Sequence, residues 1–538
     1  MVDHQQGKYL EEGEDTLPAE QSKRFGQSAQ ATATVSDSSA PSSRTARSSR
    51  GKSTKQRKPT FIERTINNWF NRLLGAASEG SFGAQEEQYA ANRTSRDYVW
   101  NTVGITAWGM VFPALTIVAT QLVGVEQAGM FSMAFVVGML LMIVANYGVR
   151  TYQVSDVEEA HSFSDYQINR LITCAIMMLV GVLYCFVRGY AEDMLVISMG
   201  VYFYKMIDGL ADVYEGRLQQ MGKLYLSGIS QAVRSILVLV VFSICLLITH
   251  NLAVSSIVMA IAALVSFVIF TLPLALLETP KSRKFNLGCI RALFKQCFPL
   301  FLALFLYALV DNMPKFVMEG VLSYDNQLYF NALYFPAQGI LLTIGLIYKP
   351  QLVRMTNLWA DREKRKRFDL MIVVILVIIV ALTGAMVFVM GWIGLPLMSF
   401  MYGVDFEQFR GLCFIMLVAG GVTAAIDFLY QVITVLRRQK EVTKLYLVAF
   451  GFSLFIPILL VQFTGLPGIV IGYLIVMSIL LVLLVWEYVR IRLGYFHESA
   501  AQANQETEKY RPSELRAQRD RLKQHRGSGV SKDSEKRK

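Results

Sequence analysis

Residues 127–149 read "QAGMFSMAFVVGMLLMIVANYGV" and contain no charged side chain. A helix of about 20 mostly apolar residues crosses the roughly 30 Å of hydrocarbon in a bilayer, so this run is long enough to span a membrane. A surface helix of a water-soluble protein carries polar residues along one face, which this run lacks. The stretch therefore predicts a transmembrane helix.

Eleven more long, mostly apolar runs lie between the strongly polar N-terminal and C-terminal regions of the chain, and 53% of all residues are hydrophobic. None shows the alternation of polar and apolar residues that is typical of a barrel strand. The sequence therefore predicts an all-α, polytopic integral membrane protein with about twelve transmembrane helices. The predicted spans are 98–122, 127–149, 169–188, 194–214, 226–249, 252–278, 297–318, 326–348, 369–394, 409–436, 442–464 and 467–490.

Lysine and arginine are concentrated in the links that follow even-numbered spans. The link after the eighth span carries seven of them between residues 349 and 367, whereas the odd-numbered links carry little beyond Arg188 and Arg410. Cytoplasmic loops of membrane proteins are enriched in these two residue types. We therefore expect the even-numbered links and both termini in the cytoplasm.

The pattern divides the chain into six expected segments. Two sets of six spans share one membrane orientation, as in transporters whose halves are related by a pseudo-twofold axis along the membrane normal. The segments are a disordered, basic cytoplasmic tail (1–60), an interfacial amphipathic helix and linker (61–96), a first six-helix lobe (97–279), a cytoplasmic linker (280–296), a second six-helix lobe (297–491) and a charged cytoplasmic tail (492–538).

The region before the first span has a feature typical of membrane surfaces. Seven lysines and arginines lie between residues 44 and 58, and the following "FIERTINNWFNRLLG" (61–75) has apolar residues at helical spacing. Such a helix beside a basic cluster binds anionic lipids of the inner leaflet. The alternative is a disordered tail in which the spacing arises by chance.

Sequence signatures of catalysis are absent. There is no phosphate-binding loop and no HExxH motif, and the five histidines are scattered without the spacing of metal ligands. The outer links are too short to hold the catalytic groups of a sugar polymerase or ligase. The six cysteines lie in spans or on the predicted cytoplasmic side, and we interpret them as small apolar residues. We therefore expect no enzyme, no cofactor, no metal site and no nucleic-acid partner.

Several predicted spans contain charged residues. A charge at the centre of a bilayer costs about 2.5–3.5 kcal/mol on insertion scales, so such residues are functional candidates. The candidates are Lys205 and Asp208 in the fourth span, Arg234 in the fifth, Asp311 and Lys315 in the seventh and Asp427 in the tenth. The alternative is that the pairs in the fourth and seventh spans neutralise each other during insertion and take no part in transport. Four further charged residues lie near span ends and are expected to extend to the membrane surface: Asp212, Glu215, Arg217 and Glu319.

The signs of these charges suit two ligands of opposite charge. Arginine and lysine bind an anionic diphosphate, carboxylates bind a coupling cation such as H⁺ or Na⁺, and asparagine suits sugar hydroxyls. The predicted substrate-binding residues are Asn146, Arg150, Lys205, Arg234, Asn312 and Lys315, and the predicted coupling-ion residues are Asp208, Asp311 and Asp427. For Arg150, the alternative is an ordinary positive anchor at the cytoplasmic surface.

Three segments carry a family resemblance. They are "NYGVRTYQVSD" (146–156), "DNMPKF" (311–316) and "YFNALYFPAQGI…IYKPQLVRMTNLW" (329–359). In this order on twelve spans, they resemble polysaccharide flippases of the Wzx type in the MOP exporter superfamily, over residues 97–491. The resemblance implies two six-helix lobes, MOP/MATE-like in fold, around a central cavity. It also implies that the link 150–168 lies at the inner mouth, with its tyrosines in the headgroup layer.

The resemblance further implies a function and its partners. Such proteins move an undecaprenyl-diphosphate-linked oligosaccharide from the cytoplasmic to the outer leaflet of the bacterial plasma membrane, driven by a cation gradient, beside polysaccharide polymerase and glycosyltransferase machinery. One alternative is a MATE-like multidrug or metabolite antiporter, which would favour carboxylates in its cavity. A second alternative is a lipid II flippase. An enzyme on this fold is disfavoured by the short outer links.

Overall fold

The structure is a computed structural model that describes residues 93–494 except 157–158, 191, 283–285, 361–363 and 437. The described residues form helices and short connections, without a β-strand. The predicted tail 1–60, the predicted amphipathic helix 61–75 and residues 495–538 lie outside the described residues.

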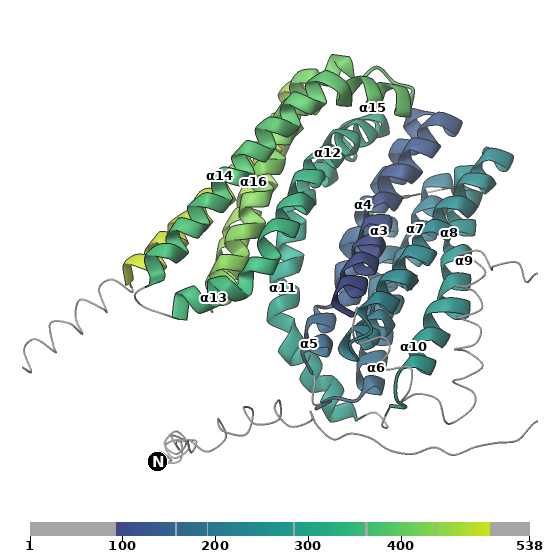
Figure 1. The fold of residues 1–538 in the computed structure, drawn as a ribbon. Coiled ribbons are helices and arrows are strands. Elements are labelled where there is room, and N and C mark those ends of the chain that lie inside the picture. Colours follow the sequence, from purple (N-terminus) through teal and green to yellow (C-terminus); the bar gives the residue numbers. More distant parts are fainter. Residues whose placement is uncertain are drawn as a thin grey trace, which may run out of the picture. The chain divides into compact units, whose positions relative to one another are not determined.

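Twelve helices in the described part are long and apolar enough to cross a membrane, which confirms the predicted all-α fold and the number of spans (Figure 1). The first six are α3 (Arg93–Val123), α4 (Val125–Asn146), α6 (Phe163–Arg188), α7 (Glu192–Gln220), α8 (Leu224–Thr249), and a sixth built from α9 (Leu252–Ser266), the π-helical turn η2 (Phe267–Thr271) and α10 (Leu272–Glu278). The second six are α11 (Leu287–Met318), α12 (Tyr324–Tyr348), a ninth built from α14 (Arg365–Val389), the π-helical turn η5 (Met390–Gly394) and α15 (Leu395–Tyr402), then α16 (Arg410–Val435), α17 (Gln439–Thr464) and Leu466–Gly494.

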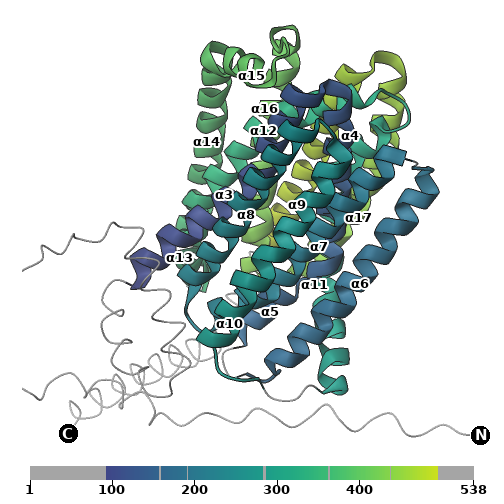
Figure 2. The same cartoon turned by 90° about the vertical axis from the view of Figure 1, so that its right-hand side faces the viewer.

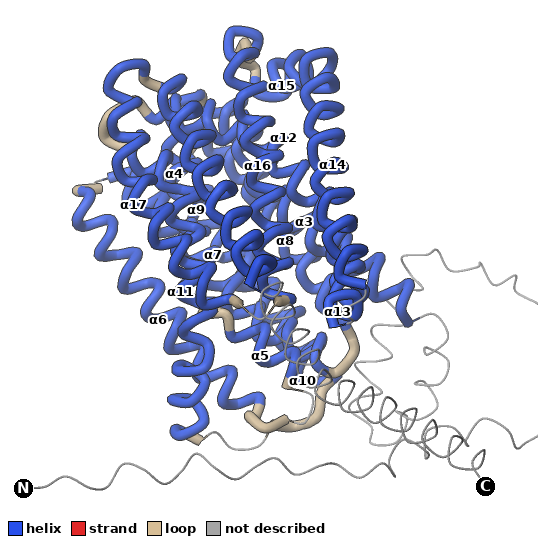
Figure 3. Tube along the Cα trace, turned by 90° about the vertical axis from the view of Figure 1, so that its left-hand side faces the viewer, coloured by secondary structure: helices blue, strands red, loops and turns tan. Residues whose placement is uncertain are grey.

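In the part of the chain that the structure describes, three short helical segments lie in the links between spans: α5 (Val149–Ser155), η3 (Lys349–Gln351) and α13 (Leu352–Ala360). The 3₁₀ turn η6 (Glu407–Phe409) lies at the start of the tenth span. Figures 1 and 3 show α5 and α13 at one end of the long helices and α15 at the opposite end. We call these the α5 end and the α15 end. The charge pattern of the sequence predicts that the α5 end faces the cytoplasm.

Helix α6 begins six residues before the predicted span at 169, because polar residues start it. The Ser162 side chain accepts a hydrogen bond from the Asp165 backbone N–H, and the Asp165 carboxylate accepts one from the Ser162 backbone N–H at 2.9 Å. This reciprocal capping satisfies two backbone donors that a helix N-terminus otherwise leaves free. The helix ends at Gly189, whose φ of 68° favours glycine.

Each half of the chain packs its own helices together. In the first half, α3 lies along α8, and α7 packs against α4 and α9 (Figure 2). The approach of α3 to α8 needs glycine, since a Cβ at Gly104 would lie 2.5 Å from the Gly228 carbonyl oxygen. In the second half, α12 packs on α16, and α11 packs on α17.

The two halves meet along α4 and α12. A Cβ at Gly129 of α4 would lie 2.0 Å from the Tyr324 carbonyl oxygen of α12, so the two backbones touch there. Deeper along the same contact, Asn331 Nδ2 donates to Ser132 Oγ at 2.8 Å. The expected lobe boundaries, 97–279 and 297–491, stay a prediction.

Candidate functional site

A row of charged residues follows one face of α7. Lys205, Asp208, Asp212 and Glu215 are spaced by three or four residues, which places them on the same side of a helix. Helices α5, α6 and α8 supply basic side chains to this face. Helix α7 thus carries four charged residues on this face, whereas the sequence singled out only Lys205 and Asp208 in this span as functional candidates.

Asp208 binds three donors within the first half of the protein. Its carboxylate accepts hydrogen bonds from Arg234 Nε at 2.9 Å, Trp108 Nε1 at 3.0 Å and Lys205 Nζ at 3.2 Å. Arg234 also contacts Glu215 at 2.8 Å. Only 1% of the Lys205 and Asp208 side chains is exposed. These two residues pair with each other, which is the arrangement that the alternative interpretation describes.

Asp212 binds two arginines from different helices. Arg150 Nη1 of α5 lies 2.6 Å from one carboxylate oxygen, and Arg170 Nη2 of α6 lies 2.8 Å from the other. Arg170 also donates to the Asn146 Oδ1 and to the Ala145 carbonyl oxygen. The sequence interpretation missed Arg170, although its position two residues inside the predicted third span was a usable signal.

These residues form one cluster, which we call the α7 network: Arg150, Arg170, Lys205, Asp208, Asp212, Glu215 and Arg234. Four formal cations face three carboxylates, so the network holds one excess positive charge. Arg150 is its most exposed member, with 31% of its side chain accessible. Burial lowers the pKa of Arg150, but the carboxylates of Asp212 and Glu215 raise it above its ordinary value, so the guanidinium stays charged.

The expectation that four charged residues extend to the membrane surface is wrong for three of them. Glu215 is 2% exposed and accepts from Arg234 and Ser230. Arg217 is 1% exposed and pairs with Glu159 at 2.8 Å. Glu319 is 6% exposed and is bonded at the α15 end as described below. The physical reason is that other parts of the protein cover these span ends, so ion pairs replace water.

Asp311 in the second half has a different environment. Its carboxylate accepts hydrogen bonds from Tyr334 at 2.8 Å and from Tyr473 at 2.7 Å. Lys315 donates to Asn312 Oδ1 at 2.9 Å and lies 4.3 Å from the centre of the Tyr334 ring. The pairing of Asp311 with Lys315 that the alternative interpretation describes is therefore replaced by contacts to neutral groups.

Asp427 shows the same pattern. Its carboxylate accepts a hydrogen bond from Tyr348 at 2.5 Å. Nearby, Tyr446 packs against Tyr307 with ring centres 5.5 Å apart and against Tyr430 at 6.2 Å. A phenol is a neutral donor, so it does not cancel the charge of a carboxylate. Both Asp311 and Asp427 are half-buried.

The two predicted asparagines are engaged within the protein. Asn146 Oδ1 accepts from Arg170 at 2.5 Å. Asn312 donates to the Ala308 carbonyl oxygen at 2.9 Å and accepts from Lys315. A sugar hydroxyl would have to replace one of these partners.

Helices α6 and α11 are hydrogen-bonded at both ends. At the α15 end, Glu319 follows α11 and accepts from Tyr184 at 2.7 Å, from Arg188 Nε at 3.0 Å and from Tyr190. At the α5 end, Asp165 Oδ1 of α6 accepts from the backbone N–H of Asn286, the residue that caps α11, at 2.7 Å. Helices α6 and α11 thus connect the two halves of the chain, with one set of hydrogen bonds at each end of the spans.

The link after α4 lies against α11. The ring of Tyr147 stacks on Phe301 with centres 4.5 Å apart, and the Tyr152 hydroxyl donates to the Gln296 carbonyl oxygen at 2.8 Å. Tyr166 is 1% exposed and donates to Asp156. The expectation that the tyrosines of this link lie in the headgroup layer is therefore wrong for Tyr166, because the start of α6 is packed inside the protein.

Comparison with known proteins places this arrangement in context. No family model matches the sequence, and no curated protein matches it. Among solved structures, the chain is similar to the lipid II flippase MurJ in an inward closed conformation, with a TM-score of 0.55 and 12% identity over 74% of this chain and 87% of that one. It is also similar to an inward-facing multidrug resistance MATE family transporter of the MOP superfamily, with a TM-score of 0.54 and 14% identity over 73% and 98%. The chain has a MATE-like fold.

A third similar structure is a MOP superfamily transporter from Pyrococcus furiosus, with a TM-score of 0.50 and 17% identity over 74% of this chain and 95% of that one. A binding pocket of reverse polarity is ascribed to that transporter. The MATE-like fold and the twelve apolar helices make this chain a multi-pass membrane protein. Within that MATE-like fold, the polar interior differs between the halves: ion pairs in the first, and carboxylates bonded to tyrosines in the second.

Proposed function

We propose that this chain is a flippase that moves an undecaprenyl-diphosphate-linked oligosaccharide from the cytoplasmic to the outer leaflet of a bacterial plasma membrane, for cell-surface polysaccharide biosynthesis. The movement is alternating access coupled to H⁺ or Na⁺, with both termini in the cytoplasm. Support comes from the three segments that resemble Wzx-type flippases and from a fold similar to both a flippase and a transporter.

The observation that carries the proposal is the position of Arg150 at the exposed edge of a network with excess positive charge. Its Nη1 contacts Asp212, whereas its Nη2 contacts the neutral acceptors Gln219 at 3.1 Å and Ser227 at 3.4 Å. A phosphate oxygen can replace these neutral acceptors while the ion pair with Asp212 persists, because one guanidinium binds two acceptors side by side. The α5 end is the predicted cytoplasmic end, from which the substrate enters.

In this mechanism the second half supplies the coupling site. Asp311 and Asp427 are bonded to tyrosine hydroxyls, so a proton or Na⁺ can neutralise either carboxylate without displacing a basic side chain. Asp208 differs, since Lys205 and Arg234 already compensate its charge. We therefore propose Asp311 and Asp427 as the coupling residues and give Asp208 a structural role.

The strongest alternative is a cation-coupled multidrug or metabolite antiporter. The carboxylates and aromatic rings of the second half suit an organic cation, since such rings attract cations through their faces. A lipid II flippase is the other alternative, and it shares the need for a diphosphate-binding arginine. We further propose that the basic tail binds anionic inner-leaflet lipids and that polymerase or glycosyltransferase machinery acts beside the protein.

Reconstitution in proteoliposomes distinguishes these functions. The assay follows the leaflet exchange of fluorescent undecaprenyl-diphosphate oligosaccharide, of lipid II and of an organic cation, each with and without an imposed pH or Na⁺ gradient. Gradient-stimulated exchange of the oligosaccharide lipid supports the proposal. Exchange of lipid II alone, or efflux of the organic cation alone, overturns it in favour of the corresponding alternative.

A further inference from the structure

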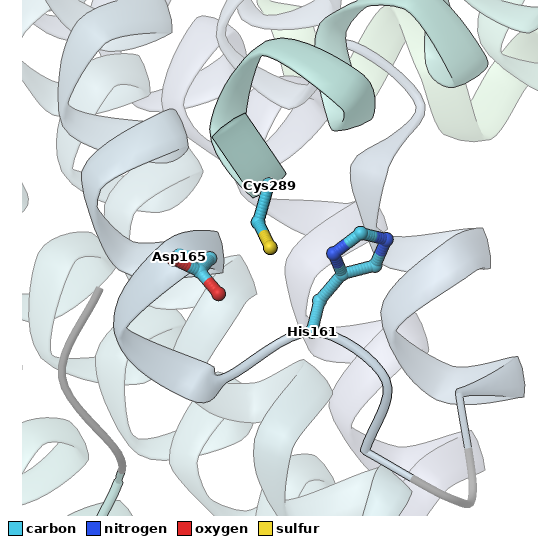
Figure 4. Close-up of side chains that lie close together, drawn as sticks. All are labelled: His161, Asp165 and Cys289. Carbon is cyan, nitrogen blue, oxygen red and sulfur yellow. The ribbon is translucent and has the colours of Figure 1, made fainter. Parts of the chain in front are cut away.

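Three potential metal ligands meet at the α5 end, outside the α7 network and the carboxylates of the second half. They are His161 in the link before α6, Asp165 in the first turn of α6 and Cys289 in the first turn of α11. One ligand atom from each lies within 4.8 Å of the other two. Figure 4 shows the three side chains directed toward a common point, with a ring nitrogen of His161 on the side of Cys289.

The geometry points to a binding site for a divalent transition-metal ion of the Zn²⁺ type, with one imidazole, one carboxylate and one thiolate as ligands. Zinc accepts all three ligand types and is usually four-coordinate, so a water molecule completes the shell. Zn–N and Zn–S bonds of about 2.0–2.3 Å separate neighbouring ligand atoms by about 3.5 Å. The three side chains therefore need to approach one another by about an ångström, which rotation of the half-exposed His161 and Cys289 provides.

The His161 ring has an unsatisfied atom in this position. Its Nδ1 is buried and has no hydrogen-bond partner among the residues that the structure describes. A buried polar atom without a partner costs free energy, typically about 1–3 kcal/mol. Ligation of a metal ion through this nitrogen would remove that cost.

The backbone and carboxylate of the site are oriented by other groups. The Asp156 carboxylate accepts from the His161 backbone N–H at 3.0 Å, which fixes the link that carries the imidazole. Asp165 Oδ2 accepts twice from Ser162, but Oδ1 accepts only from the Asn286 N–H and keeps one lone pair for a metal. Such supporting hydrogen bonds hold metal ligands in place in known sites.

The sequence could not show this site, because Cys289 lies 124 positions beyond Asp165 and no ligand spacing connects them. The ion would bind α6 and α11 together beside the Asp165–Asn286 hydrogen bond. Cys289 is a free thiol, and it loses its proton when it binds the metal.

Metal binding to the purified full-length chain tests the inference. The tag is removed, the protein is treated with a chelator, and Zn²⁺ is added in competition with a chromogenic indicator. We expect one Zn²⁺ per chain, and at least about tenfold weaker binding in His161→Ala and in Cys289→Ser. Matched controls are His250→Asn and Cys245→Ser, which change a histidine and a half-exposed cysteine elsewhere and should bind like the wild type. Absence of stoichiometric binding, or unchanged binding in both ligand variants, overturns the inference.

A second measurement uses the unmodified chain and so does not depend on the folding of variants. Alkylation by a maleimide is followed at each cysteine by mass spectrometry, with and without Zn²⁺. Zinc should slow the reaction of Cys289 at least about tenfold and leave that of Cys245 unchanged. Equal rates at Cys289 with and without zinc, or equal protection of both cysteines, contradict the site.

Discussion

Arg150 and Asp212 join the link after α4 to helix α7: Nη1 and Oδ1 lie 2.6 Å apart. Arg170 occupies the other oxygen of the same carboxylate at 2.8 Å. Arg170 therefore compensates the charge of Asp212 independently of Arg150. In the proposed function Arg150 keeps its contact with Asp212 and exchanges only the neutral acceptors Gln219 and Ser227 for a phosphate oxygen, and the first prediction follows from this.

Arg150→Ala should lower the rate of oligosaccharide-lipid exchange at least about tenfold, because a hydrogen bond to a charged group contributes about 1.5–3 kcal/mol. The fold should persist, since Arg170 still compensates Asp212. The measurement is the exchange rate in proteoliposomes. Arg410→Ala is the matched control, as Arg410 is an exposed arginine paired with Glu407. A wild-type rate in Arg150→Ala would remove Arg150 from the substrate path.

Arg234→Ala should destabilise the protein strongly. It leaves Asp208 with Lys205 as its one cation and Trp108 as a neutral donor, and it leaves Glu215 without its ion pair; both carboxylates are 2% exposed or less. Removing one partner of a buried pair costs about 3–5 kcal/mol, whereas Arg410→Ala should cost no more than about 1 kcal/mol. The melting temperatures of the detergent-solubilised variants, read by size-exclusion fluorescence, provide the test. Equal melting temperatures would show that the α7 network contributes little to stability.

Asp311→Asn should abolish the stimulation of exchange by an ion gradient and leave gradient-independent exchange in place. The amide oxygen still accepts from Tyr334 and Tyr473, so the local structure is kept, but the group no longer binds a proton or Na⁺. The same assay with and without a gradient measures the ratio, which should fall to about one. Asn326→Asp, a change of similar size at a half-exposed position, is the control. Undiminished stimulation in both Asp311→Asn and Asp427→Asn would place the coupling site elsewhere.

Glu319→Ala should shift the protein toward opening at the α15 end. The change removes the side-chain bonds to Tyr184, Arg188 and Tyr190, and charged hydrogen bonds of this kind are each worth about 1.5–3 kcal/mol. A cysteine at Ser132, buried between α4 and α12, reports the opening. Its alkylation by a membrane-impermeant maleimide should accelerate at least about tenfold in the Glu319→Ala background. The same rate in both backgrounds would show that these bonds do not control access.

The sequence was sufficient to predict the membrane spans, but it was not sufficient to predict which residues contact the charged side chains within them. Apolar runs predicted twelve helices because hydrocarbon thickness imposes length on each span, a local property. The partners of Asp311 lie 23 and 162 positions away, and the tyrosines have no charge that would mark them. Glu215 and Glu319 were misplaced for a related reason. The distance of a residue from the end of an apolar run indicates its depth in the membrane. It does not show whether water or another part of the protein surrounds the side chain at that depth.

The bonding of α6 to α11 at both ends has a consequence for leakage. The contact of Glu319 with Arg188 holds one end, and the contact of Asp165 with Asn286 holds the other. Separating these helices at one end breaks one set of bonds, and separating them along their whole length breaks both sets. A continuous aqueous path between α6 and α11 is therefore the least favourable state. In the proposed transport cycle, this arrangement preserves the ion gradient of the membrane while the substrate passes.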